Sequence, residues 1–353
     1  MINLQSVKRI VIKIGTSAIT QSDGTIDEDF LQRIAAQIES LRKENKEILI
    51  VSSGAVGCGM KELSLLQKPR DSKLRQVCAA VGQTNLMVHW KEAFPQSTIA
   101  QLLITYDTFS HRKLYVQLQG TLMDLLKRKI IPIINENDPI AIVGADFGDN
   151  DRLSALIATK MQADLLIVLS DVEGLYDDQK KLIPVVQEIV NDTFRYVHKS
   201  GGLGKGGMAR KLEAIKIATS AGIPVVLVRG KTKEVLLDVT HGKKIGTLFL
   251  AKDRRSSVKT WLEQTHHHGI VTVDSGAANA LKKGKNLLPV GVRKVEGTFD
   301  AGEVVAIVCD GMIVAKFRTA FSSKEINVMV ASKVKENITK KDNLLVLEHE
   351  EKV

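Results

Sequence analysis

Four short polar segments, each directly after an apolar run, carry residue types that bind phosphate and amino groups. They read KIGTS at 13–17, SSGAVG at 52–57, NEND at 135–138 and SD at 170–171. Glycine lets backbone N–H groups approach an anion closely, and the start of a following helix adds positive potential. A single turn of this kind is more often an ordinary connection between a strand and a helix. Four of them at equivalent positions predict a site for an anionic substrate.

A fifth polar segment, GGLGKGG at 201–207, is rich in glycine. It contains the GxGxxG pattern of dinucleotide-binding loops, but the polar residues 195–200 before it do not form the buried strand that this motif needs. A P-loop is excluded as well, because the only GKT tripeptide has Val225 where the first glycine must stand. The segment predicts an anion-binding loop in which Lys205 and Lys211 face nucleotide phosphates. The alternative is an ordinary surface loop.

Two acidic residues, Asp149 and Asp151, flank Asn150 at the predicted start of a helix. A carboxylate in this position can be a simple helix cap, because it opposes the positive end of the helix dipole. Asp138 and nearby asparagines extend the acidic patch, however, and place it beside a lysine-rich one. An amino-acid substrate would need this pairing, with acidic groups for its ammonium and cations for a transferred phosphoryl group.

Apolar runs that alternate with amphipathic patterns predict the elements that position these residues. Strands are expected at 7–14, 47–51, 98–104, 130–134, 164–169 and 223–228, and helices at 30–41, 114–126, 152–161 and 208–221. Thr25 and Glu28 have the spacing of a capping box, and residues 180–190 predict a hairpin. The alternation indicates an α/β fold, an open and mostly parallel sheet with helices on both faces. Ligands bind such sheets beyond the carboxyl ends of the strands.

The sequence changes character near residue 250. Residues 251–259 are charged and non-periodic, which predicts a linker. Beyond it, short strand-like runs are separated by glycine-containing turns, with strands expected at 270–273, 304–308 and 312–316 and one short helix at 277–282. We therefore expect two domains, an α/β domain at 1–258 and a small, mostly β domain at 268–353.

Composition limits the classes of function. The formal net charge of the 353 residues is +10, which would suit a nucleic acid, but residues 261–353 hold 13 basic and 12 acidic residues. The excess of basic over acidic residues therefore lies in the larger domain, where binding of small anionic substrates explains it as well as binding of a nucleic acid does. No apolar run reaches the roughly 18 residues that span a bilayer, so we expect a cytoplasmic protein.

Cysteine and histidine give no sign of a metal site. The three cysteines are far apart and predict reduced thiols. The three consecutive histidines at 266–268 point in different directions and have no other His or Cys nearby. No protein-bound metal is predicted.

Taken together, the polar segments resemble the amino-acid kinase family. Seven motifs stand in the family's order: KIGTS at 13–17, VSSGAV at 51–56, AAVGQ at 79–83, INENDP at 134–139, GDNDRLSA at 148–155, LSDVEGLY at 169–176 and GKGGMARKL at 204–212. The end of the chain, with VDSGAANAL at 273–281 and LLPVGV at 287–292, is similar to a PUA domain. The segment Gln117-Leu118-Gln119-Gly120 departs from the family's pattern.

Within the family, the motifs most resemble those of members that use ATP to phosphorylate the side-chain carboxylate of L-glutamate, the first step of proline biosynthesis. The resemblance implies an ATP site made of Lys13, Gly15, Thr16, Ser170, Asp171, Lys205, Gly206, Gly207, Met208, Ala209, Arg210 and Lys211. It implies a glutamate site made of Ser53, Gly54, Asn135, Asp138, Asp149 and Asn150. Mg²⁺ would accompany ATP, held mainly by the phosphates and by water.

Phosphoryl transfer needs the alignment of two anions and the neutralisation of spreading charge. We therefore expect Lys13 and Lys211 to flank the moving phosphoryl group and Asp151 to hold both lysines in place. Gly15 and Gly54 would supply backbone N–H donors. The acceptor is already a carboxylate at neutral pH, so no general base is required.

Two alternatives remain open. A related kinase acting on aspartate, N-acetylglutamate or UMP would share the ATP half of the site. An RNA-binding protein is the other alternative, because PUA domains commonly bind RNA, although the nearly neutral tail argues against strong binding to phosphates. The resemblance also suggests a homo-oligomer and feedback inhibition by proline, and no membrane partner is expected.

Overall fold

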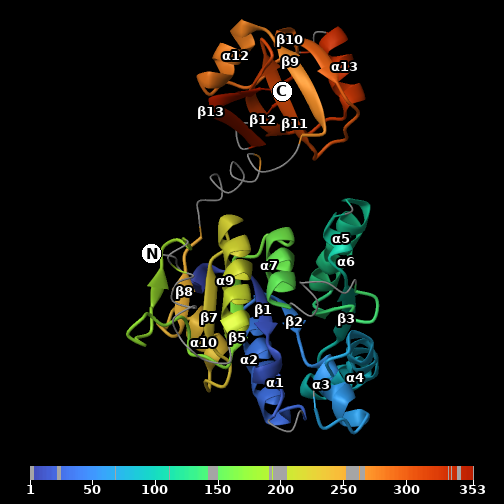
Figure 1. The fold of residues 1–353 in the computed structure, drawn as a ribbon, viewed down its shortest axis with the longest axis vertical. Helices are drawn as coiled ribbons and strands as arrows, with labels where there is room; N and C mark the ends of the chain where they lie inside the picture. The colour runs from blue at the N-terminus through green and yellow to red at the C-terminus, as the bar shows by residue number, and fades with distance from the viewer. Residues whose placement is uncertain are drawn as a thin grey trace. The chain divides into compact units, whose positions relative to one another are not determined.

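The computed structural model describes residues 4–21, 25–67, 69–110, 112–141, 150–190, 193, 205–251, 262, 267–332, 334, 336–339 and 343–352. The chain divides into two compact units, Met1–Lys252 and Asp253–Val353 (Figure 1). Each unit has its own hydrophobic core. The expected domain limits, 1–258 and 268–353, stay predictions.

The larger unit is built on one eight-stranded sheet (Figure 1). Its strands are β1 (Arg9–Ile14), β2 (Glu47–Ser52), β3 (Ile99–Ile104), β4 (Ile131–Glu136), β5 (Leu165–Ser170), β6 (Val185–Val186), β7 (Val225–Arg229) and β8 (Thr247–Phe249). They lie in the order β3-β4-β2-β1-β5-β7-β8-β6, and all pairs are parallel except β7 with β8. The expected open, mostly parallel sheet is confirmed.

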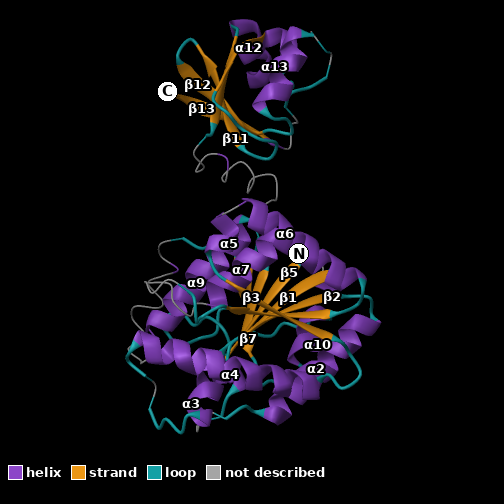
Figure 2. Cartoon of the chain, turned by 90° about the vertical axis from the view of Figure 1, so that its right-hand side faces the viewer, coloured by secondary structure: helices purple, strands orange, loops and turns teal. Residues whose placement is uncertain are grey.

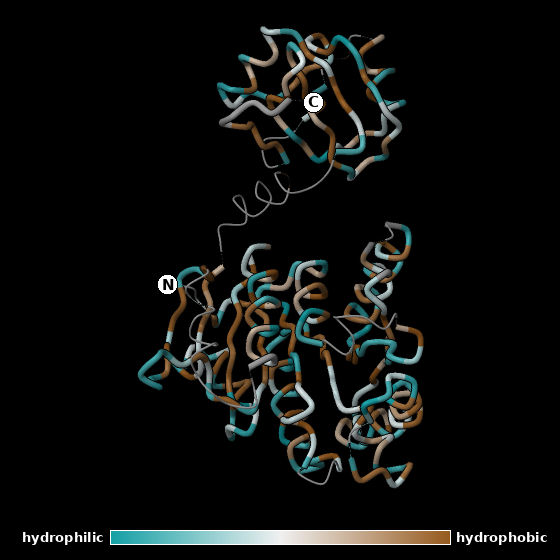
Figure 3. Tube along the Cα trace, viewed as in Figure 1, coloured by the Kyte–Doolittle hydropathy of each residue, from teal (hydrophilic) through white to brown (hydrophobic). Residues whose placement is uncertain are grey.

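Helices cover both faces of this sheet (Figure 2). They are α1 (Thr16–Ile19), α2 (Glu28–Lys43), α3 (Ala55–Glu62), α4 (Ser72–Ala93), α5 (Asp107–Ser110), α6 (Arg112–Lys127), α7 (Asn150–Lys160), α9 (Lys205–Ser220) and α10 (Val235–Thr240), after the short 3₁₀ turn Leu4–Ser6. Successive strand residues point to opposite faces. Ile10 and Ile12 therefore share a core with α2, α4 and α10, whereas Val11 shares one with α6, α7 and α9. Strands buried on both faces are hydrophobic along their length (Figure 3).

Two local predictions are wrong. The capping box predicted at Thr25 is absent, because α2 begins at Glu28 and the side chain of Asp27 accepts the Phe30 N–H at 3.0 Å. Residues 180–190 do not form a hairpin of their own. Instead, Tyr176 and Leu182 form an isolated antiparallel bridge, and β6 pairs in parallel with β8.

Helices α3 and α4 meet at two glycines, and this contact holds the polar segment that follows β2. A Cβ atom at Gly59 would lie 1.8 Å from the carbonyl oxygen of Cys78, and one at Gly82 would lie 1.9 Å from that of Ala55. No side chain fits between backbones this close. The N-terminus of α3, directly after Ser53, therefore has its position set by α4.

Replacing Gly82 with alanine should destabilise the protein by about 1–3 kcal/mol, because the added methyl group must force the two helices apart. Urea unfolding measures this. Gly120→Ala is the matched control, since Gly120 lies within α6 and a Cβ there meets nothing within 4 Å. That variant should be stabilised by up to about 1 kcal/mol through its higher helix propensity. Equal effects of the two substitutions would contradict the account of the α3–α4 contact.

The smaller unit is a five-stranded sheet in the order β10-β9-β11-β12-β13. Its elements are β9 (Gly269–Val273), α12 (Ser275–Lys282), a 3₁₀ turn (Pro289–Gly291), β10 (Val292–Glu296), β11 (Val304–Cys309), β12 (Met312–Arg318), α13 (Ser323–Ala331) and β13 (Leu344–Lys352). The expected mostly β unit is confirmed. Helix α13 was not predicted, although Ser322 and Glu325 form a capping box before it. No helix within the described residues combines the length and hydropathy that crossing a membrane requires.

Candidate functional site

The predicted site residues gather at the carboxyl ends of the central strands. Lys13, Gly15 and Thr16 lie at the end of β1, Ser53 and Gly54 follow β2, Asn135 and Asp138 lie at the end of β4, and Ser170 and Asp171 at the end of β5. Helices α7 and α9 add Asn150, Asp151, Gly207, Met208, Ala209, Arg210 and Lys211. Asp149 lies outside the described residues, and of Lys205 and Gly206 only the backbone, at the start of α9, is described.

Asp151 binds two lysines that are far apart in the sequence. Its Oδ1 lies 2.6 Å from Lys13 Nζ, and its Oδ2 lies 3.0 Å from Lys211 Nζ. Lys13 and Asp151 are buried, with 4% and 7% of their surface exposed, whereas the Lys211 side chain is 18% exposed. One carboxylate facing two ammonium groups leaves a net positive charge. We call Lys13, Asp151 and Lys211 the basic cluster.

The carboxylate of this cluster stays ionised. Burial by itself raises the pKa of Asp151, because a charged group loses its hydration. The adjacent ammonium groups of Lys13 and Lys211, which also donate hydrogen bonds to the carboxylate, outweigh burial and hold the pKa below its ordinary value of 3.8. Asp151 therefore keeps its negative charge at neutral pH.

Two glycines of the site, Gly15 after β1 and Gly54 before α3, have backbone positions that favour glycine. A Cβ atom at Gly15 would lie 3.2 Å from Lys13 Nζ, so glycine leaves room beside that ammonium. The Gly15 N–H, which was expected to donate to a phosphate, donates to the Leu169 carbonyl at 3.4 Å. Gly54 has a φ of +123°, a conformation that L side chains rarely adopt, and it precedes the first residue of α3.

Buried amide groups connect the ends of β2 and β4 with the start of α7. Asn150 Nδ2 donates to Ser53 Oγ at 2.9 Å and to Asn135 Oδ1 at 2.8 Å. Asn135 Nδ2 donates to Gln83 Oε1 at 2.8 Å, and Gln83 Nε2 donates to Gln101 Oε1 at 3.3 Å. We call Asn150, Asn135, Gln83 and Gln101 the amide chain. It joins two predicted substrate residues, Asn150 and Asn135, to Gln83 of α4 and Gln101 of β3.

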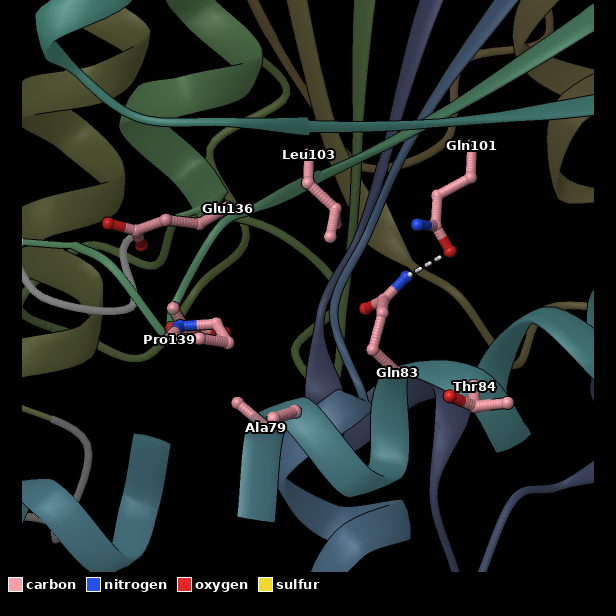
Figure 4. Close-up of a pocket in the computed structure, with 9 residues that line it drawn as sticks. Ala79, Gln83, Thr84, Gln101, Leu103, Glu136 and Pro139 are labelled. Atoms are coloured by element: carbon pink, nitrogen blue, oxygen red, sulfur yellow. Dashed lines mark hydrogen bonds between the residues drawn. The ribbon is translucent and has the colours of Figure 1, made fainter. Parts of the chain in front are cut away.

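A pocket of about 270 Å³ lies beside the amide chain (Figure 4). Its lining residues are Ala79, Ala80, Gln83, Thr84, Gln101, Leu103, Glu136, Asp138 and Pro139. In Figure 4, Gln83 and Gln101 point toward each other across one wall. The described residues that line the pocket include two carboxylates and no basic side chain. It is therefore suited to the ammonium group of a small molecule.

Asp138 titrates close to neutrality. Burial raises its pKa to about 6, and the guanidinium of Arg75 lowers it only in part. Near pH 6 the Asp138 carboxyl group is therefore partly neutral and partly ionised, whereas the Asp151 carboxylate is ionised at that pH. A cationic ligand would favour the ionised form.

The ATP side of the predicted site has a buried and an exposed part. Ser170 is 2% exposed and its hydroxyl donates to Asp171 Oδ1 at 2.9 Å, while Asp171 itself faces solvent. In the first turns of α9, Met208 and Ala209 pack against the core and Arg210 is exposed. The side chains of Met208 and Ala209 therefore face the core and not a bound phosphate.

Sequence reasoning missed four residues near the site: Arg75, Gln83, Gln101 and Glu136. Gln83 and Glu136 stand inside the AAVGQ and INENDP motifs, which is the one signal that could have found them. Their roles depend on α4 and β3 lying beside the end of β4, and residue spacing does not show this. The unusual segment 117–120 lies on α6, where Gln119 Nε2 donates to the Lys160 carbonyl at 3.0 Å.

Two families of known proteins match this chain. The profile of the amino acid kinase family matches residues 8–229, and that of the PUA domain matches residues 269–341. A protein of Methanosarcina mazei named glutamate 5-kinase is 42% identical, over 98% of this chain and 97% of the relative. Proteins of the same name from Caldanaerobacter subterraneus and Geobacter sulfurreducens are 39% and 38% identical, over 98% of this chain and 99% of their own length.

A solved structure has a similar fold. Carbamate kinase from Giardia lamblia bound to AMP-PNP matches with a TM-score of 0.51 and 20% identity, covering 70% of this chain and 100% of that chain. At this identity the likeness concerns the fold alone. The profile match and the full-length relatives together show that the chain belongs to the amino acid kinase family.

Proposed function

We propose that this chain transfers the terminal phosphoryl group of ATP to the side-chain carboxylate of L-glutamate, the activity for which its full-length relatives are named. One observation carries the proposal: the site has opposite charges at its two ends. The basic cluster lies at one end, and the pocket with Asp138 and Glu136 lies at the other. Glutamate has the matching polarity, with an ammonium group at one end and the reacting carboxylate at the other.

The proposed mechanism depends mainly on charge and alignment. The acidic pocket binds the ammonium group, and Asn150 and Ser53 hold the substrate between the pocket and the basic cluster. Lys13 and Lys211 then neutralise the charge that spreads over the moving phosphoryl group, while Asp151 keeps both amines in place. The acceptor carboxylate is already ionised, so it attacks without a general base.

Mg²⁺ fits this site as an ion that accompanies ATP and adds positive charge on the phosphates. The described residues offer no group of three His, Cys, Asp or Glu side chains that could hold a metal, so phosphates and water would hold it.

A reaction that consumes ATP suits the cytoplasm. A homo-oligomer, feedback inhibition by proline and RNA binding by the PUA domain stay predictions.

An assay that traps the acyl phosphate with hydroxylamine tests the proposed function. L-Glutamate, L-aspartate, N-acetyl-L-glutamate and UMP are compared as acceptors by ATP-dependent ADP release, and the hydroxamate is measured for the three acids. We expect glutamate to have the highest kcat/KM. N-acetylglutamate is informative because it keeps the side-chain carboxylate but has no ammonium group for the acidic pocket. A higher kcat/KM with any of the other three acceptors would overturn the assignment of glutamate.

The KM for glutamate should rise as the pH falls below about 6, the pKa to which burial raises Asp138. Below that pH the carboxyl group is neutral and no longer attracts the substrate ammonium. Initial rates at several glutamate concentrations, from about pH 5 to 8, measure the effect. Asp138→Asn should have a high KM with little pH dependence over this range. A wild-type profile as flat as that of the variant would contradict the role of Asp138.

The same substitution should stabilise the protein at neutral pH. The pKa of Asp138 is raised in the folded state, so its stabilising effect is present at acid pH and is lost as the pH rises through about 6. Asp138→Asn removes a buried carboxylate that must ionise. Above pH 6, we expect the variant to unfold at a higher temperature than the wild type, with a free energy of unfolding that is larger by up to about 3 kcal/mol.

A further inference from the structure

All donors of the amide chain point in one direction. Asn150 donates to Asn135, Asn135 donates to Gln83 and Gln83 donates to Gln101. At one end, Asn150 is 7% exposed, and its Oδ1 is buried without a hydrogen-bond donor among the described residues. At the other end, Gln101 is exposed on the edge strand β3. The chain thus leads from a vacant acceptor beside Ser53 to the surface.

A backbone group fixes this direction. The N–H of Glu136 donates to Asn135 Oδ1 at 2.9 Å. Because a backbone N–H cannot become an acceptor, Asn135 must present its oxygen there and its Nδ2 to Gln83. The same oxygen accepts from Asn150 Nδ2, so Asn150 must turn its own oxygen the other way. The vacant acceptor of Asn150 therefore depends on the orientation of Asn135.

We propose that Gln83 is a positioning residue for the substrate: by accepting from Asn135, it holds the amide chain so that Asn150 Oδ1 can accept from the substrate's ammonium group. This inference rests on the proposed function. Gln83 is 9% exposed and Asn135 is 3% exposed, so water does not readily replace the lost acceptor. Without Gln83, the buried Asn135 Nδ2 stays unsatisfied, or the side chain must move away from the Glu136 N–H to reach another acceptor. Asn150 then loses its fixed orientation.

The test compares Gln83→Met, Gln83→Glu, Gln101→Met and Gln32→Met. Gln83→Met keeps the length of the side chain but removes the acceptor, and it should raise the KM for glutamate about tenfold with the KM for ATP within about twofold. Gln83→Glu keeps an acceptor for Asn135 and should largely restore the KM. Gln101→Met removes the acceptor at the exposed end, where the effect should be about threefold. Gln32→Met is the control, since it makes the same substitution at an exposed residue of α2 that is outside the amide chain and does not line the pocket.

Glutarate, which is glutamate without its amino group, separates positioning from general damage to the fold. Because glutarate has no ammonium for Asn150 Oδ1, Gln83→Met should leave its KM nearly unchanged. The preference for glutamate over glutarate, expressed as kcat/KM, should therefore fall about tenfold. A merely structural role would weaken both acceptors equally and would also change kcat and the KM for ATP.

The outcomes distinguish this inference from the proposed function. If the wild type forms no hydroxamate with glutamate, the proposed function is wrong and the role of Gln83 is overturned with it. If the wild type is active and Gln83→Met leaves the glutamate preference unchanged, only the positioning role is wrong. If thermal unfolding shows that Gln83→Met does not fold, the glutamate KM of Gln101→Met tests the positioning role instead. In that case, equal glutamate KM values for Gln101→Met and Gln32→Met overturn the role.

Discussion

Replacing Lys211 with alanine should lower kcat by about 10² to 10³, the loss typical of removing one donor that stabilises the transition state. Lys211 contributes one of the two cations in the basic cluster, and its side chain is the more exposed of the two. The KM for glutamate should change much less, since the acidic pocket remains intact. Initial rates at saturating ATP and glutamate measure the effect.

The fold should tolerate this change, because Asp151 keeps Lys13 as its partner. Lys216→Ala is the matched control: Lys216 is exposed on the same helix, α9, and should keep normal turnover. Lys211→Arg keeps the charge but changes the geometry and should recover only part of kcat. Normal turnover in Lys211→Ala would overturn the assignment of the basic cluster.

Replacing Asp151 with asparagine should destabilise the protein by about 3–5 kcal/mol, the cost of leaving a buried charge without its partner. The charge in question is the ammonium of Lys13, which is 4% exposed and lies 2.6 Å from the carboxylate. kcat should also fall, because neither lysine is then held. Urea unfolding at neutral pH measures stability. Asp124→Asn is the control, since Asp124 forms an exposed pair with Lys127 and should cost less than about 1 kcal/mol.

The effect of Asp151→Asn should depend on pH in a defined way. The pKa of Asp151 is lowered in the folded state, so its contribution to stability is complete above its ordinary value of 3.8 and is lost as the pH falls further. The difference between wild type and variant should stay constant from neutral pH down to about 4 and shrink below it. A difference that already disappears near pH 6 would contradict the pairing with two lysines.

Much of the site could be placed from the sequence, and the reason lies in parallel sheets. Buried strands such as β2 and β5 consist of continuous apolar residues, so the polar residues after each of them mark its carboxyl end. Those ends share one edge of the sheet. This rule placed Lys13 near the other strand ends, whereas its meeting with Asp151 and Lys211 was expected from the family resemblance and from what phosphoryl transfer needs.

The predictions of local structure were wrong where two local structures fitted the sequence almost equally well. Both Thr25 and Asp27 suit a helix cap, and the structure uses Asp27. The apolar residues near Val185 fit either a hairpin or a strand paired elsewhere, and they pair with β8. Such choices depend on contacts with residues far away in the chain, which no short window of sequence contains.

By itself, the sequence determined six of the eight strands of the larger unit, four of its helices and the polar residues at the strand ends, because these follow from local patterns of apolar, glycine and charged residues. Only the tertiary structure decided the order of the strands, the pKa of Asp138 and the amide chain through Gln83. These features arise when α4 and β3 enclose the end of β4 and remove its polar groups from water. Burial and hydrogen-bond direction depend on all neighbours at once, and the chain acquires them only when it is folded.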